Sequence, residues 1–183
     1  MDGEAGVGYL MRDGFDLPPL MFTRDEIVAL VAGARLIRAW GGTNMAEATE
    51  EALVKINSVL PDDARNRAEA VQVHAFQFNG LDDETRNRLD RLERATDART
   101  RLKIQYQDDG GTATTRTIRP LGLWFWGKVW TLVAWCEMRD DFRMFRVDRI
   151  LSESTDGTYR AEPEKSLSAF YKTQPRRAEA HNS

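Results

Sequence analysis

The stretch from Thr115 to Ile150 reads TRTIRPLGLWFWGKVWTLVAWCEMRDDFRMFRVDRI. Short apolar runs alternate with polar residues, and turn-forming residues separate them, which is typical of antiparallel strands. A further strand precedes this stretch, joined to it by the hairpin sequence Asp108-Asp109-Gly110-Gly111. The predicted strands are Leu102–Gln107, Thr112–Leu121, Lys128–Met138 and Phe142–Val147. So small a sheet avoids exposed edges most simply by closing, so we expect a small antiparallel barrel.

Segments outside these strands predict an α+β domain. An alternating run, residues 71–78, predicts one more strand, and Asp82-Asp83 begins a charged helix that extends to about Ala98. After the barrel we expect a short strand at Thr158–Ala161 and a last helix near Pro163–Tyr171. The polar residues 174–183 predict a disordered tail.

The N-terminal third predicts a helical hairpin. Thr23 and Glu26 have the spacing of a capping box, and apolar residues then recur at helical spacing through residues 24–40. Gly41-Gly42 ends this helix, and a second helix runs to about Leu60. Two helices bury little surface by themselves, so we expect the pair to pack on its own barrel or on a partner subunit.

Composition predicts a soluble, cytoplasmic protein. Of the 183 residues, 42% are hydrophobic and 30% are charged, and no apolar run is long enough to span a bilayer. The N-terminus lacks the features of a secretory signal, and the single cysteine, Cys136, fits a reducing compartment. Net charge is −3, but residues 101–149 carry 9 basic and 6 acidic side chains. This local excess permits an anionic ligand.

Catalytic and metal-binding motifs are not found in the sequence. It contains no GxSxG, GxxxxGK[ST], HExxH or CxxC, and its two histidines, His74 and His181, fall in a predicted strand and in the tail. We therefore predict no enzyme activity, no catalytic residue, no metal site and no cofactor.

Arginine and tryptophan are concentrated in the stretch that opens this section. Arginine offers a planar donor fork for phosphates, and aromatic faces stack on bases. Half-buried sheets also use both residue types for structure, so composition leaves a nucleotide site and a structural role open. In a regular strand Arg143 and Arg149 would share one face while Arg146 points to the other. The residues are Arg116, Arg119, Arg139, Arg143, Arg146, Arg149, Trp124, Trp126, Trp130 and Trp135.

Three motifs in this region resemble the WYL domain of bacterial transcriptional regulators. They are RxxxP from Arg116 to Pro120, GxxWxLVAWC from Gly127 to Cys136, and RxFRVDRI from Arg143 to Ile150. The segment from Gly8 to Leu36 resembles the linker that follows the winged helix-turn-helix in YafY-like members. The resemblance implies an Sm- or SH3-like barrel that senses an effector.

The resemblance implies four parts along the chain. They are a linker remnant after a missing wing at 1–22, a helical dimerisation segment at 23–68, the WYL barrel at 69–173 and the tail at 174–183. Two departures are visible: Thr131 stands where the family has Tyr, and the helix-turn-helix is absent. By its own sequence the chain should not read operator DNA, and regulators of this kind generally act as homodimers.

The effector class that the resemblance implies is single-stranded nucleic acid or a nucleotide-like anion. Motif position selects the candidate ligand-binding residues, with Arg116 and Arg143 first as phosphate forks. Trp130 is either a stacking surface or a core anchor, and Arg149 beside Asp148 has a structural alternative. A structural or partner-binding barrel with a degenerate pocket remains the competing function, favoured by Thr131. The candidates are Arg116, Trp130, Thr131, Arg143, Arg146 and Arg149.

Overall fold

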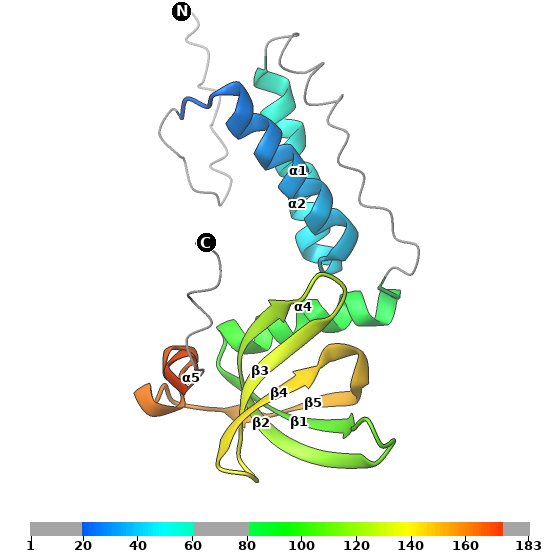
Figure 1. The fold of residues 1–183 in the computed structure, drawn as a ribbon, viewed down its shortest axis with the longest axis vertical. Coiled ribbons are helices and arrows are strands. Elements are labelled where there is room, and N and C mark those ends of the chain that lie inside the picture. Colours follow the sequence, from blue (N-terminus) through cyan, green and yellow to red (C-terminus); the bar gives the residue numbers. More distant parts are fainter. Residues whose placement is uncertain (1–19, 61–80, 174–183) are drawn as a thin grey trace, which may run out of the picture.

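The computed structural model describes residues 20–60 and 81–173. In this part of the chain, an antiparallel sheet is covered by α4 on one side and by α5 on the other, and the α1–α2 hairpin extends away from it (Figure 1). The predicted strand at 71–78 and the predicted tail lie outside the described residues. The helices are α1 (Arg24–Trp40), α2 (Thr43–Val59), α4 (Asp83–Asp97) and α5 (Leu167–Thr173).

The sheet has five antiparallel strands in the order β4-β3-β2-β1-β5. Positive φ angles at Gly111 and Gly127 allow the tight turns after β1 and β2, as the sequence predicts. The strands are β1 (Thr100–Gln107), β2 (Ala113–Phe125), β3 (Trp130–Cys136), β4 (Asp141–Arg146) and β5 (Ile150–Thr158).

Closure of this sheet into a barrel is not confirmed. Among the described residues strand pairing ends at β4 on one edge and at β5 on the other. These two strands are nevertheless consecutive in the chain, joined only by the 3₁₀ turn η1 (Val147–Arg149). A flat five-stranded sheet would hold its edges about 19 Å apart, which three residues in a 3₁₀ turn do not span. The sheet is therefore strongly curled, with its edges drawn together but unpaired.

The last strand differs from the prediction. A short strand was expected at Thr158–Ala161, but β5 begins at Ile150 and ends at Thr158. Its sequence, ILSESTDGT, lacks clear alternation, because after Ile150 most of its side chains are exposed or only half-buried. Backbone pairing with β1 therefore determines this edge strand, and hydrophobic periodicity does not reveal it.

The core lies between α4 and the concave face of the sheet. Leu92 of α4, Ile104 of β1, Ile118 of β2 and Leu132 of β3 are fully buried there. The side chain of Asp82 caps α4 as predicted, by accepting a hydrogen bond from the Thr85 N–H at 2.6 Å. The packing of these side chains holds α4 against the core face of the sheet.

Candidate functional site

Strand register divides the six candidate residues between two faces of the sheet. On β4, Arg143 lies opposite Ala134, whose side chain is in the core, whereas Arg146 lies opposite Thr131. Arg116 of β2 lies opposite the core residue Ile104, so it shares the concave face with Arg143. The predicted parity of Arg143 and Arg146 is thus found.

Arg116 is the candidate arginine whose guanidinium has no acidic partner among the described residues. Its side chain is half-buried, and its Nη1 lies 3.0 Å from Sδ of Met138 in the turn after β3. Within residues 20–60 and 81–173 no carboxylate lies within ion-pair distance of it. Thioether sulfur is a weak acceptor, so most of the hydrogen-bonding capacity of this fork is unused.

The other three arginines are each paired with an aspartate. Arg143 Nη1 lies 2.5 Å from Asp141 Oδ2, and Arg146 Nη2 lies 2.7 Å from Asp148 Oδ2. Hydrogen bonding from Arg146 holds the pKa of Asp148 below its ordinary value. An incoming anion must displace or join these carboxylates.

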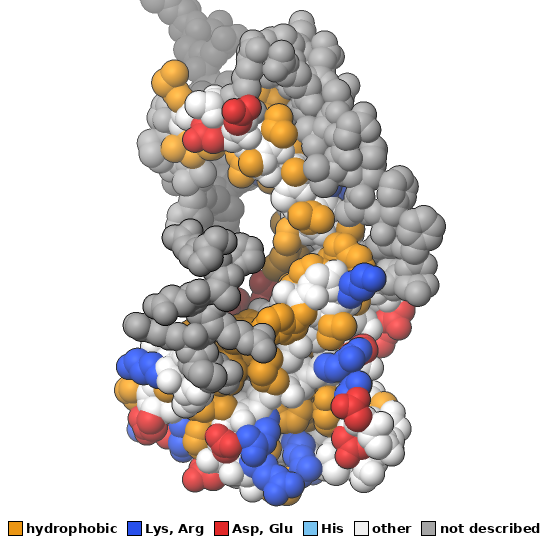
Figure 2. Space-filling view, viewed as in Figure 1, with side chains coloured by type: hydrophobic (Ala, Val, Ile, Leu, Met, Phe, Trp, Pro, Cys, Tyr) orange, Lys and Arg blue, Asp and Glu red, His pale blue; other side chains and the backbone are white. Residues whose placement is uncertain are grey.

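On the face drawn in Figure 2, basic side chains gather with acidic ones among them at the end of the sheet remote from the hairpin.

Arg149 lies outside any strand, so the expectation that it shares a strand face with Arg143 does not apply. The strand ends at Arg146, and Arg149 is in η1, where it forms an ion pair with Asp109 of the β1–β2 turn. Hydrogen bonding from Arg149 lowers the pKa of Asp109. The pair joins the connection between β4 and β5 to a distant hairpin turn, which is a structural role.

Trp130 connects the sheet to the hairpin. Its indole Nε1–H donates to the Trp40 carbonyl oxygen at 2.6 Å, at the end of α1. The ring packs on Phe125 at a centroid separation of 5.0 Å and against the core cluster. Of its two possible roles, this geometry supports the anchor.

Thr131 lies on the convex face, between Trp124 of β2 and Arg146 of β4. Its side chain is buried, and α5 contributes to the cover of this face: Tyr171 stacks on Trp124 at 5.5 Å with an interplanar angle of 15°. The structure therefore does not bring Thr131 together with Arg116 and Arg143.

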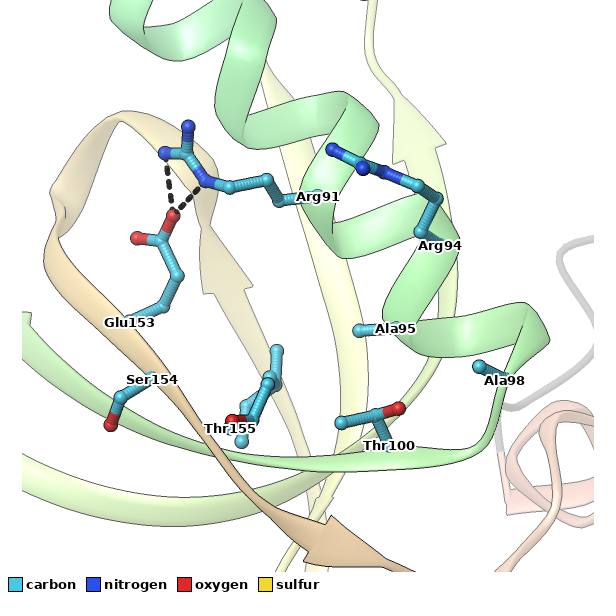
Figure 3. A pocket seen from close by; sticks show the side chains of 9 residues that line it. Arg91, Arg94, Ala95, Ala98, Thr100, Glu153, Ser154 and Thr155 are labelled. Atoms are coloured by element: carbon cyan, nitrogen blue, oxygen red, sulfur yellow. Dashed lines mark hydrogen bonds and ion pairs between the residues drawn. The ribbon is translucent and has the colours of Figure 1, made fainter.

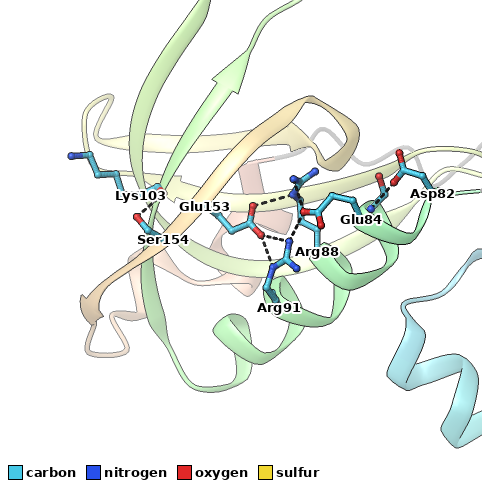
Figure 4. Close-up of polar contacts among 8 residues, drawn as sticks. Asp82, Glu84, Arg88, Arg91, Lys103, Glu153 and Ser154 are labelled. Carbon is cyan, nitrogen blue, oxygen red and sulfur yellow. Dashed lines mark hydrogen bonds and ion pairs between the residues drawn. The ribbon is translucent and has the colours of Figure 1, made fainter.

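A partly buried charge network between α4 and β5 was missed by sequence reasoning. Arg88 Nε and Arg91 Nε bind the two oxygens of Glu153 at 3.0 and 2.6 Å, and both arginines also contact Glu84 (Figure 4). Arg88 is only 7% exposed. The sequence shows the charges of α4, but Glu153 belongs to the strand that was not predicted.

Two residues of α4 hold the turn of the helical hairpin. The Arg86 guanidinium donates to the carbonyl oxygens of Ala39 at 2.7 Å and of Gly41 at 2.9 Å, so it caps the C-terminus of α1. Asp90 Oδ2 accepts from the Asn44 N–H at 3.0 Å, at the start of α2. One helix thus supplies a cation to the negative end of α1 and an anion to the positive end of α2.

The described part of the chain was compared with the requirements of a metal site and of a membrane-spanning helix. No cluster of three or more histidine, cysteine, aspartate or glutamate side chains that could hold a metal ion occurs there. No helix in those residues is long and apolar enough to cross a membrane.

Comparison with known proteins matches a solved structure and a family model. A solved structure, proteasome accessory factor B/C (PafBC) of Arthrobacter aurescens, is 20% identical, with a TM-score of 0.40 over 76% of this chain. The chain spans 21% of the length of that protein. The family model for the WYL domain matches residues 87–153, a segment that includes all six candidate residues. A WYL domain is thus found over residues 87–153, from α4 into β5.

Proposed function

We propose that this chain is the effector-sensing part of a bacterial transcriptional regulator. Its effector is single-stranded nucleic acid or a nucleotide-like anion, and Arg116 is the principal phosphate contact. The observation that carries the proposal is the half-buried guanidinium of Arg116, which among the described residues meets the thioether of Met138 and no carboxylate. The other three candidate arginines, Arg143, Arg146 and Arg149, each pair with an aspartate.

Arg143 is the second contact, with a weaker contribution. It lies on the same face of the sheet as Arg116, but its Nη1 is shared with Asp141 and with the Phe142 carbonyl oxygen. A phosphate gains the full attraction of Arg143 only when the carboxylate is displaced.

A titration of the chain with a fluorescent single-stranded oligonucleotide tests this proposal. Arg116→Ala should weaken binding about tenfold or more, the amount expected for loss of a charged hydrogen bond. Arg143→Ala should have a smaller effect, and Asp141→Asn should strengthen binding by freeing Arg143. The exposed Arg160→Ala is the matched control, since it removes a cation outside this face.

Salt dependence separates phosphate contacts from other binding. The logarithm of affinity should fall with the logarithm of salt concentration by about 0.7 for each phosphate neutralised, and Arg116→Ala should flatten this slope. Duplex DNA should bind more weakly, because its bases are not free to stack. Salt-independent binding, or unchanged affinity in the Arg116→Ala/Arg143→Ala double variant, contradicts the proposal.

A structural or partner-binding domain with a degenerate pocket is the second candidate. The ion pairs of Arg143, Arg146 and Arg149 favour it, because each cation already has an internal partner. Under this function no oligonucleotide should bind at physiological salt, and Arg149→Ala should lower the melting temperature by opening the contact between η1 and the β1–β2 turn.

A further inference from the structure

A cavity of about 380 Å³ lies between the last two turns of α4 and strand β5 (Figure 3). This volume is in the range of small-molecule sites. Ala95 and Leu102 are buried and form its apolar floor, and Thr155 of β5 forms part of the opposite wall. The cavity is on the side of α4 that faces β5, and neither Arg116 nor Arg143 lines it.

The two ends of the cavity differ in chemistry. Arg91 and Arg94 project from α4 at one end, and Ala98 and Thr100 lie at the other, where the helix passes into β1 (Figure 3). Arg91 is already bound to Glu153 and Glu84. Such a site is complementary to an amphipathic molecule, charged at one end and apolar at the other.

Arg94 supplies the unbalanced positive charge. Its Nε donates to the Asp90 carbonyl oxygen at 3.2 Å, and among the described residues no carboxylate lies within ion-pair distance of its guanidinium. The C-terminus of α4 carries partial negative charge, but this field falls off within the last turn. The cavity end at Arg91 and Arg94 therefore suits the anionic group of a ligand, and the end at Ala98 suits its apolar part.

We propose that this cavity binds a small organic anion, with one carboxylate or phosphate group on a compact apolar body. The anionic group binds the guanidinium of Arg94 and the N–H groups of Arg91 that Glu153 and Glu84 leave free. The apolar body covers Ala95 and Leu102. Because the same helix holds the hairpin turn through Arg86 and Asp90, such a ligand lies on the element that connects the sheet to α1 and α2. This site is independent of the oligonucleotide contacts proposed above.

The test uses NMR titration of the ¹⁵N-labelled full chain with four probes. Phenyl phosphate carries both required features, inorganic phosphate lacks the apolar body, and benzyl alcohol lacks the charge. Benzoate, as a fourth titration, distinguishes a preference for carboxylate from one for phosphate. We expect phenyl phosphate or benzoate to shift amide signals of residues 91–102 and 153–155, and to bind at least tenfold more tightly than the other two probes.

Three variants locate the binding. Arg94→Gln should weaken binding of the anionic probe about tenfold, and Ala98→Leu should abolish it by filling the apolar end. Arg160→Gln, which removes an exposed arginine elsewhere, should change nothing. Circular dichroism melting confirms that each variant folds. Equal affinity for phenyl phosphate and benzyl alcohol, or undiminished binding in Arg94→Gln, overturns the proposal. Oligonucleotide binding should be the same in Arg94→Gln and the unaltered chain, which separates this site from the oligonucleotide contacts.

Discussion

The carboxylate of Asp82 is the N-cap of α4, the helix on which the sheet and the hairpin both depend. Hydrogen bonds from Thr85 hold the pKa of Asp82 below its ordinary value. Thr23 has the same role at α1, where its Oγ1 accepts a hydrogen bond from the Glu26 N–H at 3.3 Å. In return, Glu26 Oε2 accepts a hydrogen bond from the Thr23 N–H at 2.6 Å. Each cap satisfies N–H groups that the helix leaves without partners.

We expect Asp82→Ala to lower the free energy of unfolding by about 1 kcal/mol at pH 7, as for other lost caps. Because the pKa of Asp82 is lower in the folded chain than in the unfolded one, its contribution is fully present above the unfolded value, near 4, and is lost as pH falls through the lower folded value. Urea unfolding at several pH values should show the two stabilities converging below about pH 4. A constant difference down to pH 2 would contradict this, and Asp83→Ala, in the same turn, is the control.

Local signals made the caps predictable, but not the partners of the arginines. Each cap joins residues three positions apart in the sequence. The ion pair of Arg146 with Asp148 is also local, because its residues are two positions apart. Arg149 instead meets Asp109, and Arg88 meets Glu153, across long stretches of chain. Those contacts depend on register and on a turn position, which no local pattern specifies.

At the scale of elements, the Gly41-Gly42 turn requires glycine because of its neighbours. The backbone of Gly42, with φ of −64°, is one that any residue adopts. A Cβ there would lie 2.1 Å from Asp90 Oδ1, and the short Asp90 side chain can withdraw only by losing its bond to Asn44. The sequence predicted this turn as a helix end, but its contact with α4 was not predictable from the glycines alone.

Gly42→Ala should therefore destabilise the protein by about 1–3 kcal/mol, the usual cost of overpacking. Gly33→Ala is the matched control, since a Cβ there meets nothing within 4 Å and alanine favours a helix interior by about 0.5–1 kcal/mol. Thermal unfolding should shift in opposite directions for the two variants. In an Asp90→Ala background the cost of Gly42→Ala should shrink, and an undiminished cost would mean that the contact with Asp90 is not its cause.

Strand patterns were informative wherever one face of a strand meets the core. β1 to β4 appear where the apolar patterns predict them, within a few residues at their ends, because each strand places side chains in the core, and β3 is buried on both faces. β5 was missed because burial leaves little pattern in it. The sequence pattern also could not show whether the sheet closes into a barrel, because closure depends on whether the edge strands β4 and β5 pair once the sheet has curled.

The whole molecule combines a well-covered sheet with a thinly covered hairpin. In α1 and α2 the buried apolar side chains are Ile27 and Val31, joined by Leu60 just beyond α2. Leu36 and Val54 are 48% and 66% exposed, although both are large apolar residues on helices. Among residues 20–60 and 81–173, the contacts of Arg86, Asp90 and Trp130 hold the turn end of the hairpin. Exposed apolar surface of this kind commonly marks a protein–protein interface.

We expect the chain to form a homodimer through residues 20–60, with the exposed apolar side chains of α1 and α2 buried between copies. Static light scattering at tens of micromolar should return twice the chain mass. Val54→Glu and Leu36→Glu should shift the mass toward the monomer, because a buried carboxylate without a partner is costly. Leu151→Glu, at a residue of β5 that is also 48% exposed, should leave the dimer intact. A monomer mass for the unaltered chain, or equal loss of dimer in all three variants, would place the interface elsewhere or remove it.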